Sequence, residues 1–254
     1  MKGEIRTYRS LHNIERFRFF NATVFESDLH IGVDNASFDH SLIEFVTCEI
    51  QRTREILNEY NILNSTFFSS LTPLPLDDSA ETEISSMLKA GIIASVGPMA
   101  AVAGLTSETV GKRVLENFPI KEIVVENGGD IWASVKETLF VEILAGNSPL
   151  SGKLALKIPH GKTPLGICTS SGTVGHSLSF GKADAVVICA HDASIADAFA
   201  TAVCNIVKTE SDIDKALEFT SQFKEILSTV IVINDKIAVS GEFEIVALLT
   251  PRAF

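Results

Sequence analysis

The stretch EIVVENGGDIWASV (residues 122–135) decides the fold class, because it places two strand-forming runs on either side of a glycine pair. Its β-branched residues favour strands, and Gly128-Gly129 permits the positive φ angles of a tight turn. We expect residues 126–132 to form that turn between paired strands, with the glycine backbone facing the main cleft. An ordinary hairpin turn without a ligand is the alternative interpretation.

Strand-like and helix-like runs extend from this hairpin in separate clusters. Periodicity predicts strands near residues 17–33, 139–145, 153–157, 165–169, 185–189, 229–233, 236–239 and 243–248. It predicts helices near residues 42–57, 84–92, 98–117, 193–207 and 212–227. This clustering favours an α+β fold, with mainly antiparallel sheets packed against helices, over a doubly wound parallel sheet. We expect one compact domain over residues 1–254, with two intertwined lobes as the alternative.

Composition excludes two broad classes of protein. The formal net charge is −11 and no basic run occurs, which opposes binding to nucleic acid. The N-terminus MKGEIRTYRS lacks the apolar stretch of a signal peptide, and the uncharged run 90–107 is interrupted by glycine and proline. Four scattered cysteines without CxxC spacing are typical of reduced thiols. We therefore expect a cytoplasmic protein with no membrane span, and a homo-oligomer remains open.

A hydroxyl-rich loop follows the strand expected at 165–169. Ser170, Ser171, Gly172 and Thr173 can turn several N–H groups toward an anion, as phosphate-binding loops do. His176, three residues on, has a side chain able to accept a proton near neutral pH. A surface loop with a solvated histidine is the alternative.

The alanine-rich helix at 193–207 carries one formal charge, Asp197, beyond its expected N-cap Asp192. Thr201 lies four residues later, hence on the same helical face. A carboxylate and a hydroxyl so placed are hard oxygen ligands suited to Mg²⁺. The alternatives are an Asp197 that favours the helix dipole, or one paired with a lysine such as Lys182.

These three segments together resemble the ApbE superfamily, the FAD:protein FMN transferases. The resemblance rests on ENGGDIW (126–132), TSSGTVGH (169–176) and ADAFATA (196–202), in that order. The runs AGNSPLSGKLAL (145–156) and GICTSSGTVGHSLSFGKADAV (166–186) are similar to a cytosolic, uncharacterised ApbE-like protein family. The resemblance covers residues 90–207 well.

The resemblance implies a bound FAD and a Mg²⁺ that bridges the protein and the diphosphate. The implied metal ligands are Asp197, Thr201 and a backbone carbonyl near Ala103. The implied cofactor-binding residues are Asn127, Gly128, Gly129, Asp130, Ser170, Ser171, Gly172 and Thr173, and the implied catalytic residue is His176.

The sequence also departs from the family pattern. After His176 it reads Ser-Leu-Ser-Phe-Gly, so the family's Asp-Pro-x-Thr-Gly segment is absent, and the middle helix lacks the family lysine. The leading hypothesis is therefore a flavin-site protein with Mg²⁺-dependent FMN transfer to a protein acceptor, or FAD diphosphate cleavage. The alternatives are a non-catalytic binder of a flavin, nucleotide or other metabolite, and an interaction protein with a degenerate site.

Overall fold

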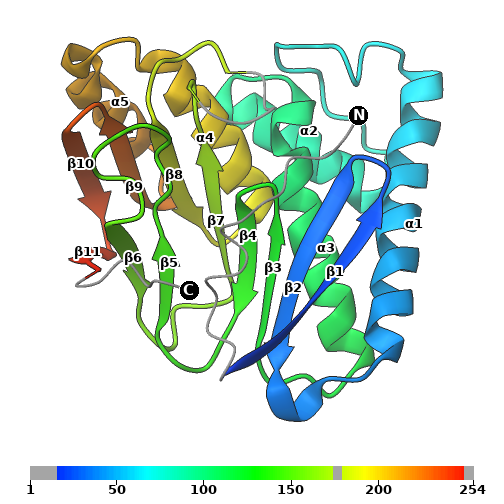
Figure 1. Cartoon of the computed structure of the whole chain (residues 1–254). Helices are drawn as coiled ribbons and strands as arrows, with labels where there is room; N and C mark the ends of the chain where they lie inside the picture. The colour runs from blue at the N-terminus through cyan, green and yellow to red at the C-terminus, as the bar shows by residue number, and fades with distance from the viewer. Residues whose placement is uncertain (1–15, 174–178, 249–254) are drawn as a thin grey trace.

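The computed structural model describes residues 16–173 and 179–248, and it has an α+β fold (Figure 1). The large sheet has eight strands in the order β1 (Phe17–Val24), β2 (Ser27–Asp34), β3 (Ile123–Asn127), β4 (Asp130–Ser134), β7 (Leu165–Ser170), β8 (Ala185–Ala190), β9 (Ile226–Ile233) and β10 (Lys236–Gly241). The small sheet orders β11 (Glu244–Ala247), β6 (Leu154–Ile158) and β5 (Leu139–Glu142). Every strand pairing described in the two sheets is antiparallel, which agrees with the mainly antiparallel sheets predicted from the sequence.

The helices lie against one face of the large sheet, and the small sheet covers part of the other (Figure 1). They are α1 (Ser41–Leu63), α2 (Thr82–Ala94), α3 (Val102–Asn117), α4 (Ala193–Ile206) and α5 (Ile213–Ser221), with short 3₁₀ turns at Asn35–Ser37, Pro98–Ala101 and Glu210–Asp212. The helices therefore form one layer, the large sheet a second and the small sheet a third.

Both faces of β8 are buried, which explains why its sequence AVVICA lacks alternation. Val186, Ile188 and Ala190 pack into the core beneath the helices. Ala185 and Val187 pack into the second core, between the two sheets. The central strands thus hold the two cores together.

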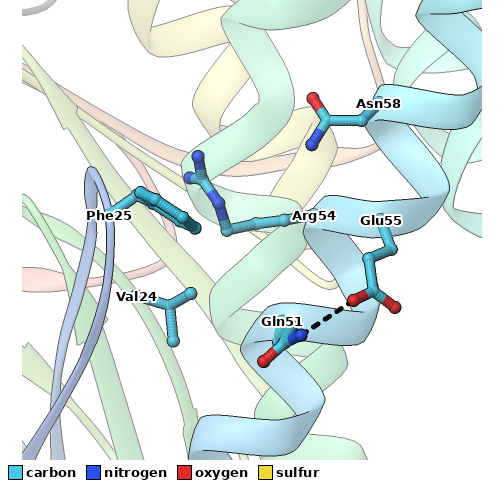
Figure 2. Close-up of a pocket in the computed structure, with 6 residues that line it drawn as sticks. All are labelled: Val24, Phe25, Gln51, Arg54, Glu55 and Asn58. Carbon is cyan, nitrogen blue, oxygen red and sulfur yellow. Dashed lines mark hydrogen bonds between the residues drawn. The ribbon is translucent and has the colours of Figure 1, made fainter.

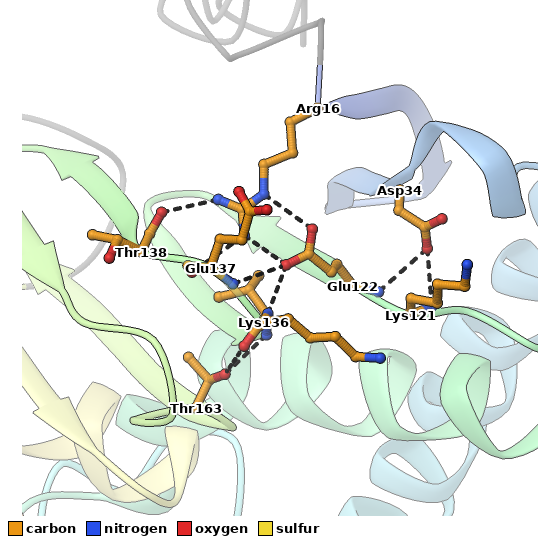
Figure 3. A network of polar contacts seen from close by, with 9 residues as sticks. Arg16, Asp34, Lys121, Glu122, Lys136, Glu137, Thr138 and Thr163 are labelled. Atoms are coloured by element: carbon orange, nitrogen blue, oxygen red, sulfur yellow. Dashed lines mark hydrogen bonds and ion pairs between the residues drawn. The ribbon is translucent and has the colours of Figure 1, made fainter.

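A polar network closes the end of the sheet opposite the β3–β4 turn (Figure 3). Arg16 donates from Nε to Glu122 Oε2 over 3.0 Å and from Nη2 to Glu122 Oε1 over 2.6 Å. The same Oε1 accepts the backbone N–H of Lys136 over 2.6 Å, and Arg16 also donates to the carbonyl of Thr138 over 2.9 Å. The buried Glu122 carboxylate therefore ties the chain before β1 to the segment that leaves β4.

The apolar run 90–107 forms the end of α2, a 3₁₀ turn and the start of α3, as predicted from its glycine and proline residues. In the described part of the chain, no single helix has the length and apolar composition to cross a membrane. Among the described helices, α2 passes that test only when combined with Pro98–Asn117, and a bend of 104° separates the two.

Candidate functional site

The β3–β4 turn has the geometry that its two glycines predicted. Asn127 pairs with Asp130, so Gly128 and Gly129 alone form the turn, with φ angles of 70° and 106°. Positive φ at both central residues is the type I′ pattern, which matches the twist of the flanking strands. Asn127 Nδ2 reaches the carbonyl of Ala103 at 3.4 Å, which brings the turn against the start of α3.

Asp130 begins β4 and has a buried carboxylate, with 5% of its surface exposed. Its Oδ1 accepts the backbone N–H of Thr169 over 3.1 Å, which ties it to β7. Burial, and then the negative charge of Asp197, raise the pKa of Asp130 well above its usual value, against the lowering effect of the Thr169 N–H. Asp130 therefore retains a proton more readily than an exposed aspartate does.

Asp197 reaches the same place from α4. Its Oδ2 accepts the N–H of Ala103 over 3.1 Å and that of Gly104 over 2.9 Å, both in the first turn of α3. Burial raises the pKa of Asp197 to about 7, while those two N–H donors act in the opposite direction. Asp197 thus caps a neighbouring helix, and the described residues include no ion pair between it and Lys182 or another base.

The two aspartates interact through their charges: Asp197 raises the pKa of Asp130, which directly follows the glycine turn. Burial and the charge of Asp197 both act against ionisation of Asp130, so the two carboxylates do not ionise independently. The thiol of Cys168 lies beside them and donates to the carbonyl of Ala193 over 3.4 Å. Burial, followed by the charges of Asp130 and Asp197, raises the pKa of Cys168 well above its usual value, so it is a buried thiol rather than a thiolate nucleophile.

The remaining residues of the predicted metal site lie differently. Thr201 is one turn beyond Asp197 on α4 and is partly exposed. The carbonyl of Ala103 lies 3.0 Å from Ser107 Oγ and 3.4 Å from Asn127 Nδ2. Since the N–H of Gly104 in the same trans peptide points at Asp197, this carbonyl points away from that carboxylate. The structure therefore does not bring the Ala103 carbonyl together with the Asp197 carboxylate.

The hydroxyl loop lies further along α4. Ser170 is buried beside Cys204, which follows Asp197 by seven residues, or about 10 Å along the helix. Thr173 Oγ1 donates to Asp184 Oδ1 over 3.0 Å, and Thr173 N donates to Ser171 Oγ over 3.1 Å.

The Gly172 N–H donates to the carbonyl of Ala183 over 2.9 Å. These contacts direct much of the loop toward the start of β8, and no hydrogen bond links it to Asp197 in the described chain. His176 lies outside the described residues, so its predicted place at the rim of the cleft remains a prediction.

Two features of the site were not predicted from the sequence. The coupling of Asp130 with Asp197 joins residues far apart in the chain, and no local pattern marks it. Glu108 of α3 also enters the site region, because its Oε2 accepts the N–H of Ala193 over 2.6 Å. The available signal was a single acidic residue one turn after Gly104 in an otherwise uncharged half-helix.

A hollow of about 320 Å³ lies apart from these residues, between the β1–β2 hairpin and α1 (Figure 2). Its lining residues are Val24, Phe25, Gln51, Arg54, Glu55 and Asn58. Phe25 is 83% exposed with φ 54°, and the Arg54 guanidinium lies 5.2 Å from its ring centroid. Arg54 is already paired with Glu26 over 2.6 Å. Of the predicted site residues that the structure describes, none lines this hollow.

Across the described ranges, no group of three or more histidine, cysteine, aspartate or glutamate side chains is arranged to hold a metal ion. The Asp130–Asp197 pair supplies at most two such ligands. A cation there would take its other ligands from hydroxyl or carbonyl oxygens, water or a bound anion, which is how Mg²⁺ is usually held.

A family model and several relatives match most of the chain. A family model described as AbpE bacteria matches residues 9–238. A UPF0280 protein of Methanocaldococcus jannaschii is 36% identical over 222 residues, covering 85% of this chain and 88% of that protein. A UPF0280 protein of Methanococcus aeolicus is 39% identical over 217 residues, covering 84% and 86% respectively.

Solved structures share the fold at low sequence identity. A mutant of the flavin transferase ApbE from Vibrio cholerae aligns with a TM-score of 0.56 and 11% identity, covering 88% of this chain and 96% of that one. The apo flavinyl transferase ApbE of Pseudomonas stutzeri gives 0.55 and 11%, covering 90% and 96%. The apbe protein of Thermotoga maritima gives 0.56 and 13%, covering 88% and 97%. At these identities the likeness shows the fold alone.

Proposed function

We propose that this protein binds FAD together with Mg²⁺ at the Asp130–Asp197 pair. The proposal starts from its family, because the chain belongs to the family described as AbpE bacteria. The observation that carries this proposal is the pair itself: Asp130 after the glycine turn and Asp197 on α4 interact through their charges, and neither forms an ion pair with a base among the described residues. A divalent cation relieves the repulsion between them, and carboxylates are its preferred ligands. Fold neighbours named as flavin transferases support a flavin as the ligand.

The residues present fit the chemistry of a magnesium site in three respects. Oδ1 of Asp197 is left available, since Oδ2 takes both N–H donors of α3. Asp130 supplies a second carboxylate, and the Thr201 hydroxyl is one turn from Asp197. When bound, Mg²⁺ neutralises charge on a diphosphate.

The reaction we propose is transfer of FMN from FAD to a hydroxyl group of a protein acceptor. The hydroxyl oxygen attacks the phosphorus of the FMN half, the bond from that phosphorus to the bridging oxygen breaks, and AMP leaves. The hydroxyl proton passes to a base. With water in place of the hydroxyl, the same step gives FMN and AMP. The candidate for this base is His176, as predicted from the sequence.

Two segments of the chain would position the reacting groups in this reaction. The Gly128-Gly129 turn lets backbone approach a ligand without side-chain obstruction, since no atom lies within 4 Å of a Cβ built on Gly129. The first turn of α3 fixes the orientation of the Asp197 carboxylate. The buried thiol of Cys168 takes no part as a nucleophile.

A non-catalytic flavin or nucleotide binder is the second candidate function. It is favoured by the hydrogen bonds that direct Thr173 toward Asp184, and by the missing Asp-Pro-x-Thr-Gly segment after His176.

Incubation with FAD and Mg²⁺ separates the two candidates. The proposed reaction releases AMP, measured by chromatography, and adds an FMN mass to a hydroxyl-containing acceptor protein in a mass spectrum. Release of AMP without acceptor labelling would indicate diphosphate cleavage. FAD bound without AMP release would indicate a binding protein, and no binding with or without Mg²⁺ would contradict the proposal. Asp197→Asn is expected to lose FAD binding and AMP release. Asp192→Asn is its matched control, because it removes a carboxylate charge at the N-cap of the same helix, α4, and leaves the Asp130–Asp197 pair intact.

A further inference from the structure

We propose that Glu108 is a positioning residue for Asp197, acting through the start of α4. The expected effect on ligand binding rests on the proposed function. The effect on the orientation of Asp197 does not. Glu108 makes no hydrogen bond to Asp130, Asp197 or the hydroxyl loop within the described residues, and the hydrogen bond that it makes to α4 is at Ala193.

The contact between Glu108 and α4 is short and enclosed. Glu108 is 8% exposed, and its Oε2 accepts the N–H of Ala193, the first residue of α4, over 2.6 Å. Its Oε1 pairs with Lys112 Nζ over 2.6 Å, one turn further along α3. Both carboxylate oxygens are therefore engaged, and a charged acceptor satisfies a helix N–H that has no partner within its own helix.

A second carboxylate makes the reverse contact. Asp197 of α4 accepts the N–H groups of Ala103 and Gly104 at the start of α3. Glu108 follows Gly104 by four residues, and Asp197 follows Ala193 by four residues. Each helix thus supplies, one turn beyond the point of contact, the carboxylate that caps the other helix. We call this pair of contacts the reciprocal cap.

The two helix starts are too close to slide against each other. A Cβ built on Gly104 would lie 2.2 Å from the carbonyl oxygen of Ala193 and 2.9 Å from Asp197 Cβ. On its other side Ala193 meets β7, since a Cβ on Gly166 would lie 2.4 Å from Ala193 Cα. The start of α4 is therefore enclosed, and Glu108 is the side chain that holds its first N–H. Loss of this hold would let the first turn of α4, and with it Asp197, change orientation.

A simple surface ion pair is the competing explanation for Glu108. Lys112 is four residues away and its side chain is 58% exposed, as expected for a solvent-facing helical pair. The buried contact with Ala193 is not needed by that explanation. Lys112→Met separates the two, because it removes the ion pair and leaves the cap on α4 in place.

The direct test is the amide NMR spectrum of the ligand-free protein at Ala103 and Gly104. Glu108→Ala is expected to shift both signals, although the Glu108 side chain accepts from neither N–H group. Glu108→Gln, whose side-chain carbonyl can still accept from Ala193, is expected to restore them, and Lys112→Met to leave them unchanged. Asp192→Ala is the matched control: it removes the acceptor of the Ile195 N–H at the same helix end, and the Asp192 side chain makes no hydrogen bond to α3 among the described residues.

Ligand binding provides the second readout. Glu108→Ala is expected to weaken Mg²⁺-dependent FAD binding roughly 10- to 100-fold, as loss of an orienting partner does at metal sites. Asp192→Ala is expected to weaken it much less at a similar loss of stability. If Glu108→Ala does not fold, the same two measurements are made on Glu108→Asp, which shortens the side chain by one methylene.

Unchanged Ala103 and Gly104 signals in Glu108→Ala, or in Glu108→Asp where it is used, would overturn the inference. Equal signal shifts in Asp192→Ala would also overturn it, because they would show a general loosening of α4. Shifted signals in a protein whose wild type binds no FAD would support the reciprocal cap and contradict the proposed function.

Discussion

Replacement of Asp197 by asparagine should make the ligand-free protein more stable at pH 8. Asparagine keeps a side-chain oxygen for the N–H groups of Ala103 and Gly104, and it removes a negative charge next to Asp130. Only the charge changes, which separates electrostatics from capping. Asp197→Ala would instead leave those two N–H donors without their acceptor, and should destabilise the protein.

The magnitude follows from the pKa of Asp197. Raising it from 3.8 to about 7 disfavours the ionised form in the folded state by at most ~4 kcal/mol. Since Asp197 is partly exposed, solvent screening reduces this to about 2 kcal/mol. The folded protein binds more protons than the unfolded chain between about pH 4 and pH 7, so its free energy of unfolding falls as pH rises through that window. In Asp197→Asn, the free energy of unfolding should therefore fall much less as the pH rises from 4 to 7.

Urea denaturation at pH 4, 6 and 8 measures the difference. The two proteins should be about equally stable at pH 4, and Asp197→Asn should be more stable by about 2 kcal/mol at pH 8. Asp192→Asn, on the same helix end but away from the pair, should not reproduce this gain. Equal or lower stability of Asp197→Asn at pH 8 would refute the argument, since the charge would then be compensated in the folded protein.

Three further substitutions test the packing and the fold. Gly104→Ala should destabilise by about 3 kcal/mol in urea, because the new Cβ would collide with the carbonyl oxygen of Ala193, and a cost below ~1 kcal/mol would contradict the close contact. Gly129→Ala should cost only about 1–2 kcal/mol, from backbone strain at φ 106° without a clash, and no loss of stability would show that the turn relaxes. Glu122→Gln should cost about 2 kcal/mol at pH 7: the Arg16 hydrogen bond lowers the pKa of Glu122, so its contribution is present above pH ~4.5 and lost as pH falls. A thermal melt whose difference between the two proteins does not shrink toward pH 3 would contradict that last assignment.

Much of the local structure was predictable because it depends on local sequence. The Gly128-Gly129 turn follows from the φ angles that only glycine adopts freely, and α4 begins after Asp192, whose side chain accepts the N–H of Ile195, as predicted. The shared helical face of Asp197 and Thr201 likewise follows from a spacing of four residues.

The tertiary arrangement was less accessible, because it depends on contacts between distant segments. The strand at Glu244–Ala247 has the same character as its neighbours, yet it leaves the large sheet and pairs with β6. Phe243 packs into the second core, a fact that no sequence period indicates. The Asp130–Asp197 pair likewise exists only because β4 and α4 converge on the start of α3.

The most direct test of a Mg²⁺-dependent FAD site at Asp130 and Asp197 is calorimetric titration of FAD into the protein, once with Mg²⁺ and once with EDTA. We expect wild-type protein to bind FAD tightly only with Mg²⁺, and Asp130→Asn and Asp197→Asn each to lose that dependence. The double variant should bind no more weakly than either single variant, because the two carboxylates act as one site. Mg²⁺-dependent binding that persists in the double variant would contradict the account, since the cation would then be held elsewhere.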